Sequence, residues 1–213
     1  MTKAKRYPIP SATHRVEETI RRSRFITTVG NAGSVDEARA FIAAVSAEFA
    51  DATHNCWAYV VGSPGDTSRV GMTDAGEPHG TAGRPMLDVL LHSGIGDIVT
   101  VVTRYYGGVK LGKGGLVRAY GGGVKAAVET CPTEELVATT ELELTATYAD
   151  AESIRRLLSE YEAEIVEDDF GERVRLLIRL PEEHKEPFSE AARGVTKGRV
   201  EISGNPPERG GSR

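Results

Sequence analysis

The spacing of apolar residues over the first 130 positions predicts a sheet covered by helices. Runs rich in β-branched residues are typical of strands, and the least polar of them, Ile98–Thr103, is expected to be buried on both faces. Apolar residues that recur every three or four positions predict amphipathic helices, the first of them behind a Ser34–Glu37 capping box. The predicted strands are residues 24–30, 56–61 and 98–103, with an edge strand near 7–13, and the predicted helices are 34–49, 86–92 and 116–129.

The remaining residues predict a second, smaller unit with the order βαββαβ, which is the ferredoxin-like arrangement. Apolar and polar residues alternate over 136–148, Asp150 is expected to cap a helix, and Asp169-Phe170-Gly171 is expected to turn a hairpin. The predicted elements are strands 136–148, 164–168, 173–180 and 199–203, with helices that begin at Asp150 and Pro181.

We therefore expect a two-domain α+β chain. Residues 1–15 are expected to be a lead-in, 16–133 an N-terminal domain, and 134–203 a ferredoxin-like C-terminal domain. Residues 204–213 combine Gly, Pro and Ser with charge, so we expect a disordered tail.

Composition narrows the functional classes. Of the 213 residues, 39% are hydrophobic and 27% are charged, as in globular proteins. No run of about 18 apolar residues could cross a membrane, and the basic start is followed by Tyr7-Pro8 rather than by an apolar secretory segment. Cys56 and Cys131 form neither a CxxC pair nor a disulfide framework, so we expect free thiols and a cytoplasmic location. We predict no metal, no cofactor and no membrane partner.

The net charge of −5 is unevenly distributed along the chain. Residues 1–133 carry 15 lysines and arginines against 12 acids, which gives +3, whereas residues 134–213 carry 11 against 19, which gives −8. An anionic partner would therefore prefer the first domain. Most of the 24 glycines lie between Gly62 and Gly123, where the backbone can approach a ligand closely.

The first candidate motif lies in a long polar loop, residues 63–83, which leads to a helix start. Asp74, Glu77 and His79 combine two carboxylates with an imidazole, a set suited to acid–base chemistry on a nucleotide or phosphate ester. Helix starts bind anions because their first N–H groups have no intrahelical partner. The anion contacts expected here are Gly80, Thr81, Gly83 and Arg84. The alternative is a rigid turn whose polar groups bond to one another.

The second candidate motif, residues 104–120, leads from a strand through a glycine-rich turn into a helix, and no acid lies between Asp97 and Glu129. Cations neutralise phosphates and tyrosines stack on bases, as in proteins that hold single-stranded RNA. The predicted nucleic-acid contacts are Arg104, Tyr105, Tyr106, Lys110, Lys113, Arg118 and Tyr120. The glycines expected to complete the phosphate-contacting loop are Gly107, Gly108, Gly112, Gly114 and Gly115. The spacing fits neither a Walker motif nor a Rossmann fingerprint, and the alternative is a basic surface over core tyrosines.

A third, weaker motif is His54-Asn55-Cys56, which places an imidazole and a thiol on one side of a predicted strand. The pair could supply a nucleophile, and His54, Asp74 and His79 could ligate zinc. A buried structural cysteine is the more common role.

Together these motifs resemble the IMPACT/YigZ family of translation-linked proteins, in its bacterial two-domain form. The matching segments span essentially residues 5–130 and are Ser23–Ile26, Ala52–Tyr59, Asp74–Pro85 and Val101–Tyr120. The resemblance implies an N-terminal domain like the second domain of small-subunit ribosomal protein five, a small ferredoxin-like C-terminal domain, and a regulatory role in translation.

Three functions follow as hypotheses. The favoured one is an RNA- or ribosome-associated binding protein that regulates translation through the basic glycine- and tyrosine-bearing face of the N-terminal domain. The second is an enzyme that acts on a nucleotide or phosphate ester through Asp74, Glu77 and His79. The third is a protein-interaction regulator that binds a protein partner through the ferredoxin-like sheet.

Overall fold

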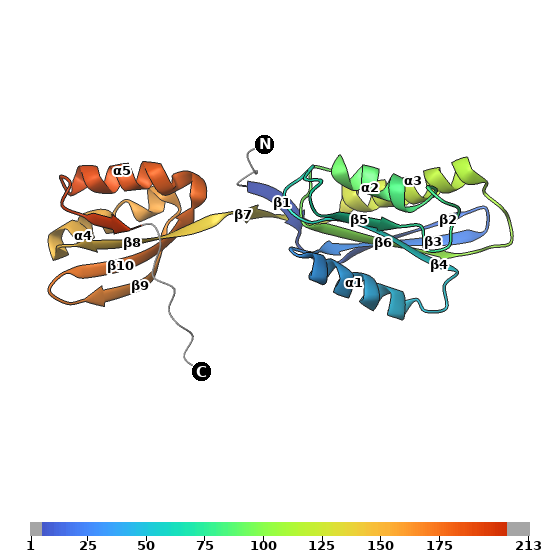
Figure 1. The fold of residues 1–213 in the computed structure, drawn as a ribbon, viewed down its shortest axis with the longest axis horizontal. Helices are drawn as coiled ribbons and strands as arrows, with labels where there is room; N and C mark the ends of the chain where they lie inside the picture. The colour runs from blue at the N-terminus through green and yellow to red at the C-terminus, as the bar shows by residue number, and fades with distance from the viewer. Residues whose placement is uncertain (1–5, 204–213) are drawn as a thin grey trace. The chain divides into compact units, whose positions relative to one another are not determined.

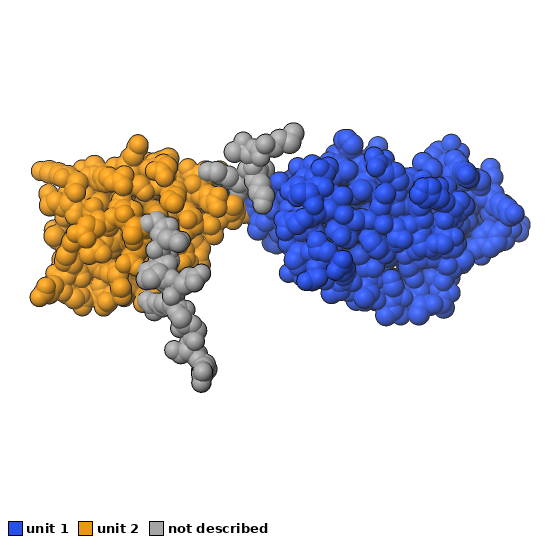
Figure 2. Space-filling model, in the orientation of Figure 1, with its two compact units in different colours: residues 1–136 blue, residues 137–213 orange. Residues whose placement is uncertain are grey.

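A computed structural model describes residues 6–203, and the chain divides into two compact units between Leu136 and Val137 (Figure 2). The expected boundary lay three residues earlier, at 133/134. The expected tail, 204–213, and the first five residues of the expected lead-in lie outside the described residues. Both units mix helices and strands around a hydrophobic core of their own, so the α+β prediction is confirmed.

Five antiparallel strands form the main sheet of the first unit, with helices on both of its faces (Figure 1). In spatial order the strands are β2 (His14–Ile20), β3 (Ser23–Asn31), β6 (Ile98–Tyr105), β4 (His54–Val60) and β5 (Val70–Thr73). Helix α1 (Val35–Glu48) covers one face, and α2 (Gly83–Leu91) and α3 (Lys113–Thr130) cover the other. A separate two-stranded sheet pairs β1 (Arg6–Pro10) with β7 (Thr133–Val137).

Strand β6 lies at the centre of the sheet and is buried on both faces, as its sequence predicts. Because successive side chains point to opposite faces, Val102 packs with Phe25 and Cys56 beneath α2 and α3. Val99 packs with Tyr59 on the face that α1 covers. This alternation fixes the side to which every later residue of β6 points.

The start of α1 is also confirmed. The Ser34 hydroxyl accepts a hydrogen bond from the Glu37 N–H at 3.1 Å, while the Glu37 carboxylate accepts from the Gly33 N–H at 2.8 Å. Two observed strands lie where the sequence pattern predicts none. β2 is mostly polar and begins inside the expected lead-in, and β5 is a four-residue strand within the expected loop 63–83.

The second unit has the predicted βαββαβ order, with its strands arranged β11-β8-β10-β9. The spatial order of the four strands is therefore fourth, first, third, second, which is the split βαβ arrangement of ferredoxin-like domains. Its elements are β8 (Thr139–Ala146), α4 (Tyr148–Arg155), the 3-10 turn η1 (Leu158–Tyr161), β9 (Glu164–Phe170), β10 (Val174–Pro181), the 3-10 turn η2 (Glu182–His184), α5 (Lys185–Val195) and β11 (Glu201–Ser203).

Several details of the second half differ from the prediction. Pro181 ends β10 instead of opening a helix, so α5 begins only at Lys185, after η2, and Asp169 and Phe170 belong to β9 rather than to the hairpin turn. The expected strand 136–148 is interrupted, with β7 ending at Val137 and β8 beginning at Thr139. Thr147 rather than Asp150 caps α4, since the Thr147 hydroxyl accepts the Asp150 N–H at 3.2 Å. The Asp150 carboxylate is instead paired with the Arg199 guanidinium at 2.6 Å. Among residues 6–203, no helix combines the length and apolar character needed to cross a membrane.

Candidate functional site

Arg104 is the first site residue that strand geometry places. It stands two positions after Val102 on β6, so its side chain points to the same face, beneath α3, and is only 5% exposed. Its guanidinium donates to the Glu77 carboxylate at 2.5 Å and to the Ser23 hydroxyl at 3.3 Å. The prediction that Arg104 contacts nucleic acid at the surface is therefore corrected, because its charge is buried and paired.

Tyr120 belongs to the same buried cluster. It lies on the α3 stripe that carries Leu116 and is fully buried, with its ring edge-on to Phe25 at 5.5 Å. Its hydroxyl donates to the same Glu77 oxygen at 2.8 Å. Burial, together with nearby Cys56 and Glu77, raises the pKa of Tyr120 well above its usual range. The prediction of a stacking platform at Tyr120 is also corrected, because the ring is part of the core.

Glu77 reaches this cluster through a tight turn. Ala75 and Gly76 both have positive φ, at 42° and 86°, and the Glu77 N–H donates to the Asp74 carbonyl at 2.9 Å. The turn directs the Glu77 side chain inward, where it is only 3% exposed. A buried carboxylate persists because a guanidinium and a hydroxyl satisfy it. The Glu77–Arg104–Tyr120 cluster is thus an internal charge pair with a phenol attached.

Asp74 fills the helix start that we expected to bind an external anion. Its carboxylate accepts from the N–H groups of Gly80, Ala82 and Gly83 at 2.8, 3.0 and 2.9 Å, and so caps α2. Burial alone would raise the pKa of Asp74, but these three N–H donors and nearby His79 outweigh it and lower the pKa. The start of α2 therefore already holds an anion, which the chain itself supplies.

The rest of this loop is bonded in the same way. The Thr81 hydroxyl donates to the Pro78 carbonyl at 2.6 Å, and the Arg84 guanidinium pairs with Asp88 at 2.9 Å. The expected phosphate contacts at Gly80, Thr81 and Gly83 are thus engaged within the turn, while Arg84 forms an exposed pair with Asp88 one turn further along α2. Of the two interpretations of this loop, the geometry matches the rigid, self-bonded turn.

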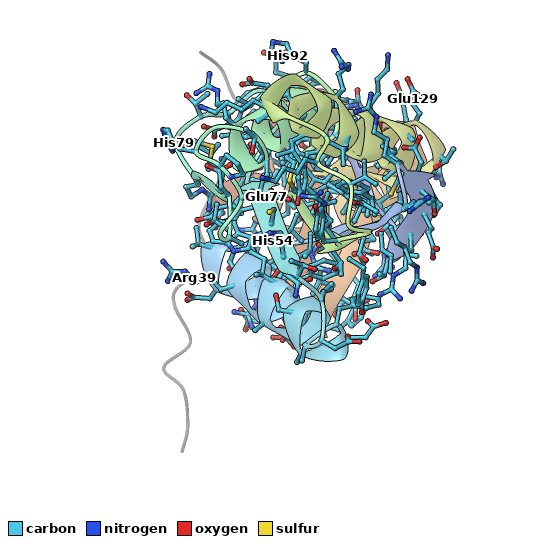
Figure 3. All side chains as sticks on the ribbon, turned by 90° about the vertical axis from the view of Figure 1, so that its right-hand side faces the viewer. Arg39, His54, Glu77, His79, His92 and Glu129 are labelled. Carbon is cyan, nitrogen blue, oxygen red and sulfur yellow. The ribbon has the colours of Figure 1, made fainter. Side chains whose placement is uncertain are left out.

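The three catalytic candidates do not converge, and Figure 3 shows His79 at the edge of the molecule, away from Glu77. Asp74 caps a helix, Glu77 is buried against Arg104, and the His79 side chain is fully exposed at 3.7 Å from the Asp74 carboxylate. An acid–base pair needs two groups that face one bound substrate. Asp74, Glu77 and His79 do not form such a pair in this arrangement.

His54 and Cys56 point to the same side of β4, as expected, but they do not form a nucleophilic pair. The Cys56 thiol is fully buried and donates to the Asp74 carbonyl at 2.9 Å, and burial raises its pKa to about 12. One ring nitrogen of His54 bonds to the Ala75 carbonyl at 2.9 Å, while the other lies 4.0 Å from the Glu77 carboxylate. Within the described chain, residues 6–203, no group of three metal-ligating side chains occurs.

The start of α3 differs from the start of α2. Its N-cap is Gly112, with φ at 74° and no side-chain cap, and the first intrahelical bond runs from the Leu116 N–H to the Gly112 carbonyl. The N–H groups of Lys113, Gly114 and Gly115 precede that bond, so they are the donors that a helix start leaves open. The predicted phosphate-contacting loop is thus open at this end.

A cavity of about 440 Å³ lies at this helix start. Tyr106, Lys110 and Lys113 line it from the surface, and all three side chains are exposed. Glu77 and Arg104 from the buried cluster line it as well. Its apolar walls are Pro78, Leu111 and Leu116. The cavity therefore joins the basic loop to the buried charge pair.

Arg104 has a further property at this cavity. Its Nε is a buried side-chain atom with no hydrogen-bond partner among residues 6–203. Two rings lie over the guanidinium, each with its centroid at 5.4 Å, namely buried Phe25 and half-exposed Tyr106. A buried donor without a partner costs about 1–3 kcal/mol of folding free energy. The Arg104 Nε is therefore a hydrogen-bond donor that residues 6–203 of the folded chain leave unsatisfied.

The other predicted contacts lie elsewhere. Arg118 is exposed on α3 and, with Arg21, lines a second groove of about 670 Å³ between β2 and α3. Tyr105 points to the α1 side, where its hydroxyl donates to Asp51 at 2.7 Å. Gly107 lets the loop pass close to the backbone of Arg22. The seven predicted contacts therefore divide into four groups. Tyr106, Lys110 and Lys113 are exposed around one cavity, and Arg118 is exposed at the second groove. Tyr105 lies on the other face of the sheet, and Arg104 and Tyr120 are buried.

The burial of Arg104 and Tyr120 can be inferred from their spacing in the sequence. Arg104 follows Val102 by two positions in a strand, and Tyr120 follows Leu116 by four in a helix, so both spacings already indicated the buried side. The participation of Pro78 and Leu111 had no such signal, because a cavity wall depends on how distant segments pack.

The chain is thus a two-domain α+β protein whose first unit holds a buried Glu–Arg–Tyr cluster beneath an open, basic helix start. Residues 21–128 match the Impact N-terminal domain, and residues 144–199 match a domain of unknown function, DUF1949. The chain belongs to the IMPACT family.

Named relatives cover almost all of the chain. It is 42% identical over 194 residues to IMPACT family member YigZ of Escherichia coli K12, covering 91% of this chain and 95% of the relative. It is 36% identical to IMPACT family member YvyE of Bacillus subtilis 168, covering 87% of this chain and 85% of the relative. A crystal structure described as that of a hypothetical protein is 40% identical and superposes with a TM-score of 0.68, covering 96% of this chain and all of that one.

Proposed function

We propose that this protein binds RNA, free or as part of the ribosome, and regulates translation through that contact. The binding surface is the α3 basic face, which we define as Tyr106, Lys110, Lys113 and Arg118. The observation that carries the proposal is the uncapped start of α3 beside two exposed lysines and an exposed tyrosine ring. Helix starts and lysines hold phosphates, while a ring offers a stacking surface to any base.

The charges on this face are not neutralised internally. Among residues 6–203, Lys110, Lys113 and Arg118 form no ion pair, so their charges are available to a partner. Elsewhere in the chain many cations are paired with acids, among them Arg155, Arg173, Arg175, Arg179 and Arg199 of the second unit. The α3 basic face, whose cations are unpaired within residues 6–203, would attract RNA phosphates although the overall charge of the protein is negative.

The test is fluorescence anisotropy with a single-stranded RNA and full-length protein. The triple variant Lys110→Ala/Lys113→Ala/Arg118→Ala removes the cations of the face. The matched control, Arg39→Ala/Lys125→Ala/Arg156→Ala, removes three exposed cations that lie elsewhere. Both variants carry exposed substitutions only, so they should fold as wild type does, and circular dichroism checks this.

Three phosphate contacts predict a definite salt dependence. Each contact to single-stranded nucleic acid contributes a slope of about −0.7, so affinity should fall about 16- to 20-fold between about 50 and about 200 mM salt. The triple variant should bind at least roughly tenfold more weakly than wild type and lose most of this slope, whereas the control should keep both. Wild-type protein that binds no RNA at low salt, or a triple variant that binds like wild type, would contradict the proposal.

A further inference from the structure

We infer that the cavity at the start of α3 holds a phosphomonoester, and that in the RNA complex this group is a terminal phosphate of the strand. The inference rests on the proposed function and makes it narrower, since it assigns the cavity to an RNA end. Four features of the structure support it: the open helix start, the charge in the cavity, the unpaired Arg104 Nε, and the way in which α2 fills its own start.

The open helix start supplies directional donors. The N–H groups of Lys113, Gly114 and Gly115 precede the first intrahelical bond of α3, and within the described part of the chain no side chain caps them. Helix α3 has 18 residues, so its aligned peptide dipoles favour an anion at this end. Gly114 leaves room there, because a Cβ at this position would meet no atom within 4 Å.

The charge in the cavity matches a dianion better than a monoanion. Lys110 and Lys113 add two positive charges, and a helix start adds the equivalent of about half a charge more. Arg104 is balanced by Glu77, the one carboxylate in the lining, so that pair adds little. A terminal phosphate carries about −1.5 to −2 near neutral pH, whereas each internal phosphodiester carries a single charge.

The buried guanidinium provides a donor that the protein does not satisfy. Arg104 is 5% exposed, lines this cavity, and leaves its Nε without a partner among residues 6–203. The half-exposed Tyr106 ring lies over the guanidinium on the cavity side of the chain. In this proposal Nε donates to an oxygen of the bound phosphate, and the Tyr106 ring stacks on the terminal base.

The same unit shows how the chain treats a helix start that it does not leave for a ligand. At α2, the Asp74 carboxylate bonds to three N–H groups at 2.8–3.0 Å. At α3, no side chain among residues 6–203 bonds to the N–H groups of Lys113, Gly114 or Gly115 in this way. A carboxylate introduced at α3 should therefore act as Asp74 does at α2 and compete with a phosphate.

This comparison defines the experiment. Gly114→Asp places a carboxylate in the first turn of α3, and Gly114→Asn is the neutral control of nearly identical shape. Both have space for the side chain, and an acid in the first helical turn favours folding. Each protein is titrated with one RNA sequence in three forms, bearing a 5′-phosphate, a 3′-phosphate, or hydroxyls at both ends. The 5′- and 3′-phosphorylated strands carry the same charge, so a preference for one of them separates recognition of the strand end from a general charge effect.

The expected result is a preference of roughly tenfold or more for one phosphorylated form in wild type and Gly114→Asn, and a ratio near one in Gly114→Asp. If all three strands bind wild type equally and with the expected salt dependence, the end-recognition inference is overturned while the proposed function stands. A preference that survives in Gly114→Asp also overturns it.

If wild type binds no strand, the proposed function fails, and calorimetry with adenosine monophosphate against adenosine then decides the cavity separately. If wild type binds adenosine monophosphate and Gly114→Asp does not, the phosphomonoester site stands, and its ligand is a free nucleotide. Equal behaviour of the two compounds would overturn the site as well.

Discussion

The buried Glu77–Arg104 pair makes a quantitative prediction about stability. Glu77 and Arg104 have side chains only 3% and 6% exposed, and their charged atoms lie 2.5 Å apart. The variant Glu77→Gln keeps the shape and the acceptor for Tyr120 but leaves the guanidinium buried without a countercharge. Breaking a buried pair by removing one partner costs about 3–5 kcal/mol, and we expect the lower end because the amide oxygen still accepts hydrogen bonds.

The assay can follow the first unit alone within the full-length chain. Trp57 is the single tryptophan and lies on β4, so its fluorescence during urea unfolding reports this unit. With a slope of about 2 kcal/mol per molar urea, a loss of about 3 kcal/mol lowers the unfolding midpoint by about 1.5 M.

Two further variants test the explanation. Glu129→Gln removes an exposed carboxylate that pairs with Lys125 at 3.8 Å, and such a pair contributes at most about 0.5 kcal/mol. The double variant Glu77→Gln/Arg104→Met removes the unbalanced charge and should recover much of the lost stability. If the midpoint of Glu77→Gln moves no further than that of Glu129→Gln, the buried pair is not what we infer it to be.

Three more outcomes follow from the site. Asp74→Asn keeps one acceptor oxygen at the start of α2 but removes the negative charge and the second acceptor, so it should cost about 1 kcal/mol at neutral pH. Because the folded pKa of Asp74 is lowered, the contribution of its charge is present above the unfolded pKa and is lost as pH falls through the folded pKa. Wild type and variant should therefore converge in acidic urea titrations, and a pH-independent difference would refute this. Cys56, with its pKa raised to about 12 by burial, should not react with Ellman's reagent at pH 8 until the protein unfolds, and rapid reaction of both thiols in native protein would contradict its burial. Gly107→Ala should destabilise the first unit because a Cβ there would overlap the Arg22 carbonyl. Gly114→Ala should instead raise the free energy of unfolding by about 0.5–1 kcal/mol in the same urea assay, because a Cβ there meets no atom and alanine loses less backbone entropy in a helix. Equal unfolding midpoints for the two variants would refute this difference.

Local pattern was sufficient for most of the secondary structure. The β-branched run at Ile98–Thr103 became the central strand, and the Ser34–Glu37 capping box began α1, because both signals arise between neighbouring residues. The polar strand β2 and the short strand β5 escaped this reasoning, since each exists by pairing with a partner strand rather than by its own pattern.

The candidate site shows the opposite balance. The sequence pointed to the segments that line this cavity, because glycines, cations and tyrosines concentrate there, but it did not separate free charges from paired ones. Arg104 and Lys110 stand six positions apart, and in the sequence both are simply cations. One is buried against a carboxylate 27 residues away in the chain, and the other is exposed at an open helix start.

By itself, then, the sequence determined the α+β class, the order of most elements and the family resemblance, all of which depend on local periodicity or on contiguous motifs. Only the tertiary structure decided that Asp74 fills the start of α2, that Glu77 accepts hydrogen bonds from both Arg104 and Tyr120, and that the start of α3 remains open. The reason is physical. Whether a charged group is satisfied depends on which distant side chain packing brings within hydrogen-bond distance, and no local pattern encodes that distance.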